Sequence, residues 1–320
     1  MTPLTIHLLI QNNEETITQA LESILPLKAN IVVADIGCCD KTAQICKSYN
    51  LSVVKINGTD RSKIRNELVS QSKTEWQFYI EPWEILLSGH EIFDSLVNEK
   101  SYAYHCEVLQ SEIITKQIRL WKKDTLHFTN PIFETLKDEN SAHAEVILYL
   151  ENKEWPDGKQ IEKWKKSNPL ATDPYYYQAC WQLFKKNYKE FLSLSEHYLF
   201  KERQQTISAT MTRYYTGIVN CLVTNDLEIA TRNALLCVAA HPLMAEFWCL
   251  LGDAYFQARE FEKSMTFYDN AMLLGKRRLR GDRWPMHISK YDEYPKEMIE
   301  SCKKVLANSS QFYVNKNQSQ

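Results

Sequence analysis

The sequence predicts an α/β domain with a mostly parallel sheet, followed by a domain built entirely from helices. Three observations lead to this fold class. Short apolar runs alternate with helical periodicity from residue 4 to about residue 84. Further strand-like runs follow until residue 150, and then the strand signal disappears. A helical pattern that repeats after about 34 residues fills most of the remaining chain, which is typical of stacked helix pairs.

The first part alternates strands and helices in the order of an open α/β layer. The expected strands are 4–10, 31–34, 51–56 and 76–80. They are apolar nearly throughout, as parallel strands covered on both faces must be. Helices are expected between them: Asn12 with Glu15 is close to a capping box, and Asp40 and Asp60 are expected to cap the next two helices.

Polar residues follow each of these strands. Gln11 and Asn12 follow the first strand, and Asp35, Asn57 and Glu81 follow the next three. Ligands of open α/β sheets bind outside the carboxyl ends of the strands. We therefore expect these residues to form one polar rim with a ligand-binding role.

The later strands and the domain limits follow from a change in pattern. Strands at 101–109 and 113–122 are close enough for antiparallel pairing, and 144–150 is expected to add another. A turn-rich stretch then runs from Asn152 to Gly158. The expected domains are 1–152 for the α/β part and 153–308 for the helical part, with a flexible tail at 309–320.

The helical part matches the pattern of tetratricopeptide repeats. The best copy starts at Ala245, with matching residues Trp248, Leu251, Gly252, Tyr255, Phe261, Tyr268 and Ala271. A looser copy starts at Met211, a shorter one is expected at 173–199, and a capping helix is expected near 298–306. Large aromatic residues fill space beside Gly or Ala where two helices approach closely, so we interpret the aromatics as core.

Composition narrows the function classes. The 320 residues carry 38 Lys and Arg against 40 Asp and Glu, a net charge of −2. This balance lacks the positive excess typical of proteins that bind nucleic acid or anionic membranes, although local patches remain compatible with it. The longest apolar stretches are far shorter than the roughly 20 residues of a spanning helix. With no visible secretory signal, we expect a cytoplasmic protein without a membrane span.

Two further features have ordinary interpretations. The nine cysteines are scattered, and Cys38, Cys39 and Cys46 lack the paired spacing of a zinc site, so we expect reduced thiols. The basic run at 276–283 is interpreted as a solvated link between the last repeat and the capping helix. The alternative is a docking site for an acidic acceptor or partner.

Several segments of the first part resemble family 2 glycosyltransferases of the Rossmann-like GT-A fold, in particular bacterial ones fused to tetratricopeptide repeats. The matching segments are 4–15, Asp35-Ile36-Gly37-Cys38-Cys39-Asp40, Arg65-Asn66, 76–84, Arg119-Leu120-Trp121 and Ile132-Phe133-Glu134. They occur in the family's order and cover roughly residues 4–136. The resemblance implies a nucleotide-diphospho-sugar donor, of the UDP-sugar class, and an acceptor hydroxyl, thiol or amide.

The resemblance also assigns donor-side residues. The acidic residue that matches Asp35 contacts the uridine moiety in the family, whereas Asp40 is expected to do no more than cap its helix. Arg65 and Asn66 fit an A-R-N element of the family and are counted as donor-binding. The alternative for Asp35 is that it merely ends a strand.

The family's metal site is degenerate in this sequence. The family binds Mn or Mg with a D-x-D-E stretch, where this chain has Glu81-Pro82-Trp83-Glu84. Trp83 has no lone pair for a hard cation, and Phe133 replaces a histidine that lies near the metal. Such a metal is typically worth several kcal/mol to the transition state, so its loss demands compensation. Lys63, Arg65 and Arg119 are the candidate phosphate-binding cations, and solvated or ion-paired arginines are the alternative.

Two functions therefore remain. Glu81, Glu84 and Glu134 are the candidate catalytic bases for a hexosyltransferase whose repeat half binds a peptide or protein acceptor. The alternative is a catalytically inactive scaffold or nucleotide-sugar-binding interaction protein, which the Glu81–Glu84 stretch favours. We prefer the transferase because donor-side features persist. Repeat domains often form homo-oligomers, but nothing in the sequence specifies one.

Overall fold

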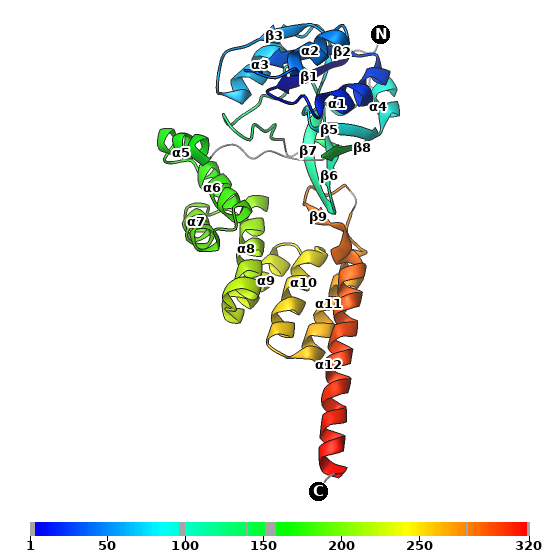
Figure 1. Ribbon diagram of the computed structural model, residues 1–320, viewed down its shortest axis with the longest axis vertical. Coiled ribbons are helices and arrows are strands. Elements are labelled where there is room, and N and C mark those ends of the chain that lie inside the picture. Colours follow the sequence, from blue (N-terminus) through cyan, green and yellow to red (C-terminus); the bar gives the residue numbers. More distant parts are fainter. Residues whose placement is uncertain (1–3, 96–99, 139, 151–157, 280, 319–320) are drawn as a thin grey trace. The chain divides into compact units, whose positions relative to one another are not determined.

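The computed structural model describes residues 4–95, 100–138, 140–150, 158–279 and 281–318, and from 309 onward it describes the backbone alone (Figure 1). The chain forms two compact units. The first comprises residues 1–156 with 283–285, and the second comprises residues 157–282 with 286–320. Residues 152–157 of the expected turn-rich boundary lie outside the described part of the chain.

The first unit contains a sheet with the strand order β3-β2-β1-β4-β7-β6-β8-β5. The strands are β1 (Leu4–Ile10), β2 (Asn30–Asp35), β3 (Val53–Lys55), β4 (Trp76–Tyr79), β5 (Glu84–Ser88), β6 (Ala103–Gln110), β7 (Ile113–Lys122) and β8 (Ala142–Leu150). β1, β2, β3 and β4 pair in parallel, which confirms the predicted α/β class. β7 is antiparallel to β4 and β6, and β8 pairs with β5 and β6. The sheet is therefore mixed beyond β4, and β5 is a strand that the sequence analysis does not predict.

The helices of this unit cover both faces of the sheet. They are α1 (Ile17–Ile24), the short helix η1 (Leu25–Leu27), α2 (Thr42–Ser48), α3 (Arg61–Gln71) and α4 (His90–Ser95). α1, α2 and α4 pack into the main core, whereas α3 packs its Ile64 and Leu68 against Leu9 of β1 and Ala34 of β2 in a separate cluster. Connections through α1 and α2 extend the sheet on one side of β1, and α3 leads to β4 on the other side. The strand order thus reverses between β1 and β4, where such sheets bind ligands.

The expected helix caps are partly wrong. Asp60 caps α3 by accepting a hydrogen bond from the Lys63 amide at 3.1 Å, as predicted. α1 instead begins after Thr16 without a side-chain cap. The side chain of Asn12 accepts from the Cys39 amide at 2.7 Å, because short amide side chains compete for loop amides as readily as for helix ends. Asp40 lies two residues before Thr42, the first residue of α2, and accepts hydrogen bonds from both the amide and the hydroxyl of Thr42.

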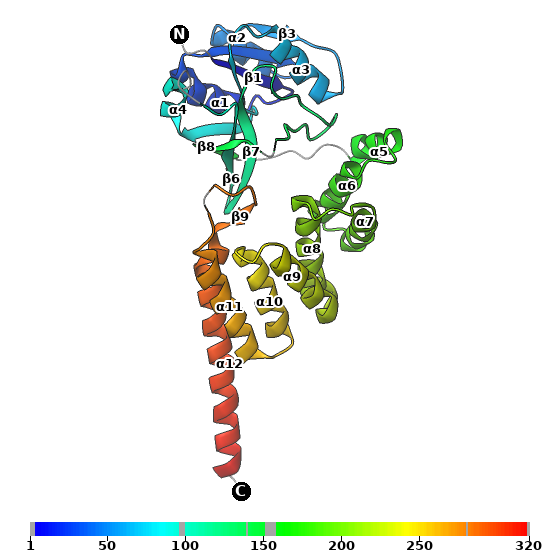
Figure 2. The ribbon, with the colours of Figure 1, turned by 180° about the vertical axis from the view of Figure 1, so that it is seen from behind.

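The second unit is helical, as predicted. Its helices are α5 (Gly158–Ser167), α6 (Asp173–Phe184), α7 (Tyr188–Lys201), α8 (Ile207–Val219), η3 (Asn220–Thr224), α9 (Leu227–Ala240), α10 (Ala245–Gln257), α11 (Phe261–Gly275), η4 (Ile288–Tyr291) and α12 (Glu293–Gln318), with the short strand β9 (Met286–His287). Figures 1 and 2 show α8 to α12 side by side. The expected close approach is present: a Cβ on Gly252 of α10 would lie 2.5 Å from the ring of Tyr268 on α11.

Two expectations differ from the structure after α11. Helix α12 continues through 309–318, where the sequence analysis expects a tail. The basic run is not a uniformly solvated link, because the Arg278 side chain is 5% exposed and pairs with Asp282 at 2.7 Å. Arg278 also bonds to Tyr291 of η4, so part of the run is tied to the following helix, whereas Arg277 is exposed. No helix in the described ranges combines the length and the apolar character needed to cross a bilayer.

Candidate functional site at the carboxyl ends of β1 and β4

Four charged side chains form a closed ring beside the carboxyl end of β4. Arg61 and Arg65 lie one turn apart on α3, Glu81 follows β4, and Glu134 lies in the loop after β7. Arg61 donates to Glu134 at 2.9 Å and to Glu81 at 3.3 Å. Arg65 donates to Glu134 at 2.7 Å and makes a shorter contact with Glu81. Each carboxylate is therefore shared by both guanidinium groups.

A second ion pair lies next to this ring and is fully buried. Arg119 of β7 donates to Glu84 at 2.6 Å, and Glu84 also accepts from the Glu81 amide at 2.9 Å. A register shift between β6 and β7 makes Arg119 an extra residue between the paired positions Ile118 and Leu120. Such bulges re-aim a side chain. The shift brings Arg119 onto the ring of Tyr79, whose centroid lies 4.1 Å from its guanidinium carbon.

Tyr79 connects the two sets of ion pairs. The guanidinium carbon of Arg65 lies 4.7 Å from the Tyr79 centroid, so both buried arginines contact one aromatic ring. Contact with an aromatic face stabilises a desolvated guanidinium. Burial raises the pKa of the Tyr79 phenol to about 12, despite the opposing charges of Arg119 and Arg65. Tyr79 therefore stays neutral at physiological pH and acts as a platform.

The surroundings set the charge of the glutamates. Burial alone would raise the pKa of Glu134, but the charges of Arg65 and Arg61 outweigh burial and lower this pKa to about 2. Burial raises the pKa of Glu84, with the charge of Arg119 opposing it. Glu134 is thus ionised and a weak base near neutral pH, whereas Glu84, whose side chain is 1% exposed, is not accessible to a substrate.

Accessibility distinguishes the members of the ring. The side chains of Arg65 and Arg119 are 1% and 2% exposed, whereas that of Arg61 is 22% exposed. Glu81 is 12% exposed and Glu134 is 6% exposed. Arg61 and Glu81 are therefore the members of the ring that a molecule in solution can reach.

The structure brings Glu81, Glu84, Glu134, Arg65 and Arg119 together, as a single site requires. The other sequence-predicted residues lie outside this cluster. Lys63 is 84% exposed and pairs with Asp60 at 3.7 Å. Asn66 clamps the backbone of Phe128, donating at 3.0 Å and accepting at 2.8 Å. Asp35 ends β2 and accepts from the amides of Gly37 and Cys38 at 2.9 and 2.7 Å.

Asp35 nevertheless shapes the same edge of the sheet. Burial would raise its pKa, but the bonds from the Cys38 and Gly37 amides lower it, so the carboxylate is ionised and fixes the loop after β2. That loop is joined to the loop after β1 through the bond from Cys39 to Asn12 and through a 3.0 Å bond from the Lys41 amide to Glu14. One wall of the β1–β4 edge is therefore rigidly held.

Sequence reasoning missed Arg61 and Tyr79. Arg61 precedes Arg65 by four residues on a predicted helix, so both side chains share one face. That spacing, set against the nearby glutamates, could have indicated a paired cluster. Tyr79 has no comparable signal in the sequence. The alternation of side chains along β4 does not reveal which arginines will lie over the Tyr79 ring.

The residues of the D-x-D-like stretch do not fit a divalent ion. In the described part of the chain, no group of three His, Cys, Asp or Glu side chains could hold a metal. Glu81 and Glu84 accept from arginines, and Trp83 packs against the main core. Phe133, at the position where the resemblance would place a histidine, has φ of 55°, a strained conformation for a bulky residue. The positive groups in this place are guanidinium groups, each paired with glutamate.

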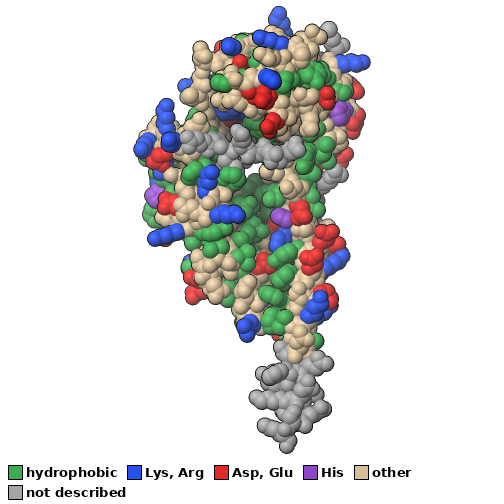
Figure 3. Space-filling model, in the orientation of Figure 1, with side chains coloured by type: hydrophobic (Ala, Val, Ile, Leu, Met, Phe, Trp, Pro, Cys, Tyr) green, Lys and Arg blue, Asp and Glu red, His purple; other side chains and the backbone are tan. Residues whose placement is uncertain are grey.

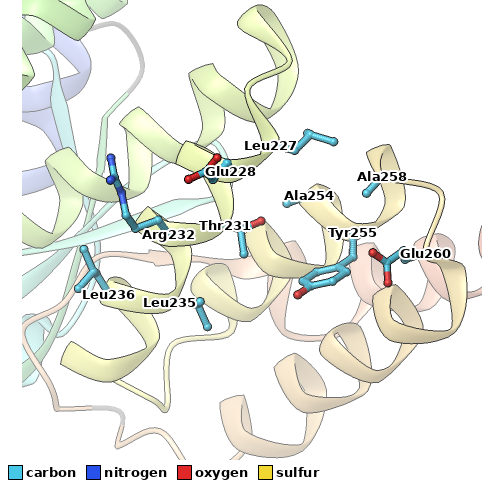
Figure 4. A pocket seen from close by; sticks show the side chains of 10 residues that line it. All are labelled: Leu227, Glu228, Thr231, Arg232, Leu235, Leu236, Ala254, Tyr255, Ala258 and Glu260. Atoms are coloured by element: carbon cyan, nitrogen blue, oxygen red, sulfur yellow. The ribbon is translucent and has the colours of Figure 1, made fainter.

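The second unit carries an apolar groove of about 600 Å³ between α9 and α10 (Figure 4). Figure 3 shows hydrophobic side chains gathered on a face of this unit. Leu235 and Leu236 of α9 are 52% and 44% exposed, and Tyr255 of α10 lies across the groove from α9. Glu228 and Arg232 add charge to the lining. Apolar surface of this kind suits a binding role.

Comparisons with known proteins are sparse at the sequence level. No family model matches the chain, and no curated protein matches it either. A solved structure of S. aureus TarS 1–349 with UDP-GlcNAc is similar over 94% of this chain and 91% of that chain, at 13% identity and a TM-score of 0.38. MamA from Desulfovibrio magneticus RS-1 covers 51% of this chain and 85% of its own, at 19% identity and a TM-score of 0.37.

Glucosyl-3-phosphoglycerate synthase from Mycobacterium tuberculosis, solved with phosphoglyceric acid, covers 33% of this chain and 43% of its own. The identity is 17% and the TM-score is 0.28. Likeness at these levels does not transfer a function to this chain.

Proposed function

We propose that this protein is a hexosyltransferase whose α/β unit binds a nucleoside-diphospho-sugar, of the UDP-sugar class, without a divalent ion. The proposal is supported by the ordered sequence landmarks of the first part and by a strand order that reverses between β1 and β4. The polar residues after β1, β2 and β4 lie at the edge where such sheets bind ligands. Asp35, at the end of β2, is the proposed contact of the uridine moiety.

The observation that carries the proposal is the position of Arg61. It is the accessible guanidinium of the ring, at the first residue of α3 and beside the carboxyl end of β4. Arginine presents donors that match phosphate oxygens bidentately. A positive group placed where charge develops on the leaving diphosphate stabilises the transition state, which is the work that a metal does elsewhere in the family.

In the proposed step, the hydrogen-bond acceptor of Arg61 changes from the Glu81 carboxylate to a phosphate oxygen of the sugar donor. Phosphate oxygens of the sugar donor accept the hydrogen bond that Glu81 Oε2 accepts from Arg61 in the free protein. Glu81 Oε1 keeps its bond from Arg65, and Oε2 becomes the oxygen that accepts a proton. The acceptor oxygen then bonds to the anomeric carbon as its proton passes to Glu81. The bond from the anomeric carbon to the diphosphate breaks, and its electron pair leaves with the nucleoside diphosphate. Arg65 and Glu134 hold the geometry of the ring throughout.

The acceptor is proposed to be a peptide or protein segment bound by the helical unit. The apolar groove between α9 and α10 supports this, since Leu235, Leu236 and Tyr255 present accessible apolar surface. Glu228 and Arg232 would then orient the segment by its charges. Replacing Leu235 with Ser is expected to raise the KM for the acceptor and leave donor binding unchanged.

A second candidate is a nucleotide-sugar-binding protein without turnover. The ion pairing favours it, because Glu84 and Glu134 are both engaged by arginines and neither is a ready base at neutral pH. Turnover therefore depends on release of Glu81 from Arg61. A protein that binds UDP-sugar but neither hydrolyses nor transfers it would match this candidate.

Calorimetry with UDP and UDP-sugars tests the proposal. We expect equal affinity in EDTA and in Mn²⁺, and a loss of about tenfold or more in Arg61→Gln, the value of a charge-assisted hydrogen bond. Lys63→Gln is the matched control, because Lys63 lies two residues away on α3 and is 84% exposed. Strictly Mn²⁺-dependent binding would refute the metal-free site, and absence of binding in either condition would refute the function.

A further inference from the structure

A basic and aromatic surface lies on the first helices of the second unit, and the proposed sugar transfer does not use it. We define the lysine–aromatic patch as Lys159, Lys163, Lys166, Trp181, Phe184, Lys185, Lys186 and Lys189. We propose that this patch docks the protein on an anionic lipid surface.

The α5 side of the patch is a stripe of cations. Lys159, Lys163 and Lys166 are exposed and follow one another at helical spacing, so they share one face of α5. Together with Trp181 they line a cavity of about 650 Å³. The one carboxylate in this lining, Glu162, is engaged by Lys165 at 2.9 Å and by Gln178 at 2.9 Å. Positive charge therefore dominates the cavity.

The stripe is continuous with the end of α6. The Lys185 ammonium lies 5.9 Å from the centroid of Trp181 and 5.6 Å from that of Phe184. Phe184 ends α6 and is 53% exposed, and Lys186 and Lys189 are exposed beside it. Trp181 is fixed from the α5 side, because a Cβ on Gly158 would lie 2.8 Å from its ring. Trp181 is thus held between α5 and Lys185, and the exposed Phe184 ring lies beside the same lysine.

Charge in this region contrasts with that of the whole chain. Residues 158–206 contain nine Lys and Arg against five Asp and Glu, whereas the chain as a whole has a net charge of −2. Lysines act as mobile point charges that attract an anionic leaflet. They do not need precisely placed partners, and a fluid lipid surface has none. An exposed aromatic among lysines is the combination found where proteins rest on headgroups.

The exposed aromatic favours a lipid surface over a soluble polyanion. An acidic peptide could be held by the cavity of α5 and would gain little from Phe184, which lies at the turn between α6 and α7. A lipid surface would interact with both the lysines and Phe184, because the lysines contact the headgroups and the Phe184 ring enters the acyl boundary. Binding that requires Phe184 and anionic lipid together would distinguish the two.

Vesicle co-sedimentation with the full chain tests the proposal. We expect binding to phosphatidylcholine vesicles that contain phosphatidylglycerol, no binding to phosphatidylcholine alone, and weaker binding at high salt. Lys185→Gln with Lys186→Gln should lower the association constant about fivefold for each lysine removed. Phe184→Ser should lower it about tenfold or more.

Leu170→Ser is the matched control, because Leu170 is 93% exposed and precedes the opposite end of α6. This variant should bind as the unchanged protein does, and circular dichroism of all variants should be unchanged. The proposal is overturned if anionic vesicles are not bound, if Phe184→Ser binds them fully, or if soluble polyglutamate competes as well as the vesicles do. UDP-sugar binding is measured in the same samples, so failure here leaves the sugar-transfer proposal separately tested.

Discussion

Arg119 and Glu84 form an ion pair of 2.6 Å between side chains that are 2% and 1% exposed. Two strands that are not neighbours in the sheet, β5 and β7, are thereby linked through charge. Desolvation of both groups is costly, so the pair is favourable only while it is complete. This makes the pair a sensitive probe of the candidate site.

Replacing Arg119 with Met should lower the free energy of unfolding by about 3–5 kcal/mol, because Glu84 would be left buried and unpaired. Adding Glu84→Leu should recover much of this loss. Glu75→Gln is the control, since it breaks the exposed pair of Glu75 with Lys122 and should cost about 0–1 kcal/mol. Urea unfolding measures all three. Equal effects of Arg119→Met and Glu75→Gln would contradict the buried pair.

Glu134 should make stability depend on pH in the acidic range. Its pKa of about 2 in the folded protein lies below the ordinary value of 4.5, so the unfolded chain takes up the proton first as the pH falls. The stabilisation is complete above pH 4.5 and is lost as the pH falls toward 2, by at most about 3 kcal/mol. Glu84 has a raised pKa and contributes with the opposite sign.

The Glu134 contribution is therefore isolated as a difference between proteins. Urea unfolding of the unchanged protein and of Glu134→Gln should converge as the pH falls from 4.5 toward 2. A stability gap that stays constant over that interval would contradict the lowered pKa.

Gly252→Ala should destabilise the helical unit by about 1–3 kcal/mol, because the new Cβ would meet the Tyr268 ring at 2.5 Å in a filled core. Gly58→Ala is the matched control, where the nearest atom to the new Cβ is Ile64 Cδ1 at 3.5 Å. Thermal unfolding of both variants is the measurement. An unaffected Gly252→Ala protein would show that α10 and α11 do not approach as closely as described.

The local sequence pattern was sufficient to predict the strands and the helix that position the site. β1, β2 and β4 are apolar runs with polar ends, and Asp60 before α3 has the chemistry of a cap, so their places followed from the sequence. β5 was missed because Glu84 opens it with a charge, and its partner β8 lies some sixty residues later, a pairing that no local pattern encodes.

The ring of charges was less predictable for the same reason. Arg65, Glu81 and Glu134 were each identified, but Glu134 meets Arg65 across 69 positions of the chain. The sequence left two readings of Arg65 and Arg119 open, phosphate binding and ion pairing. In the structure both are ion-paired, because two guanidinium groups buried to 1% and 2% exposure require partners. Arg61 was missed although it precedes Arg65 by four residues, a spacing that places both side chains on one face of α3.

The central claim is that a nucleoside diphosphate binds at Arg61 without a divalent ion. A crystal structure of the UDP complex grown with Mn²⁺, recorded with anomalous data, tests it most directly. The account predicts phosphate oxygens within hydrogen-bond distance of the Arg61 guanidinium and no anomalous peak beside Trp83. An ordered Mn²⁺ coordinated by Glu81, Glu84 and the pyrophosphate would contradict it.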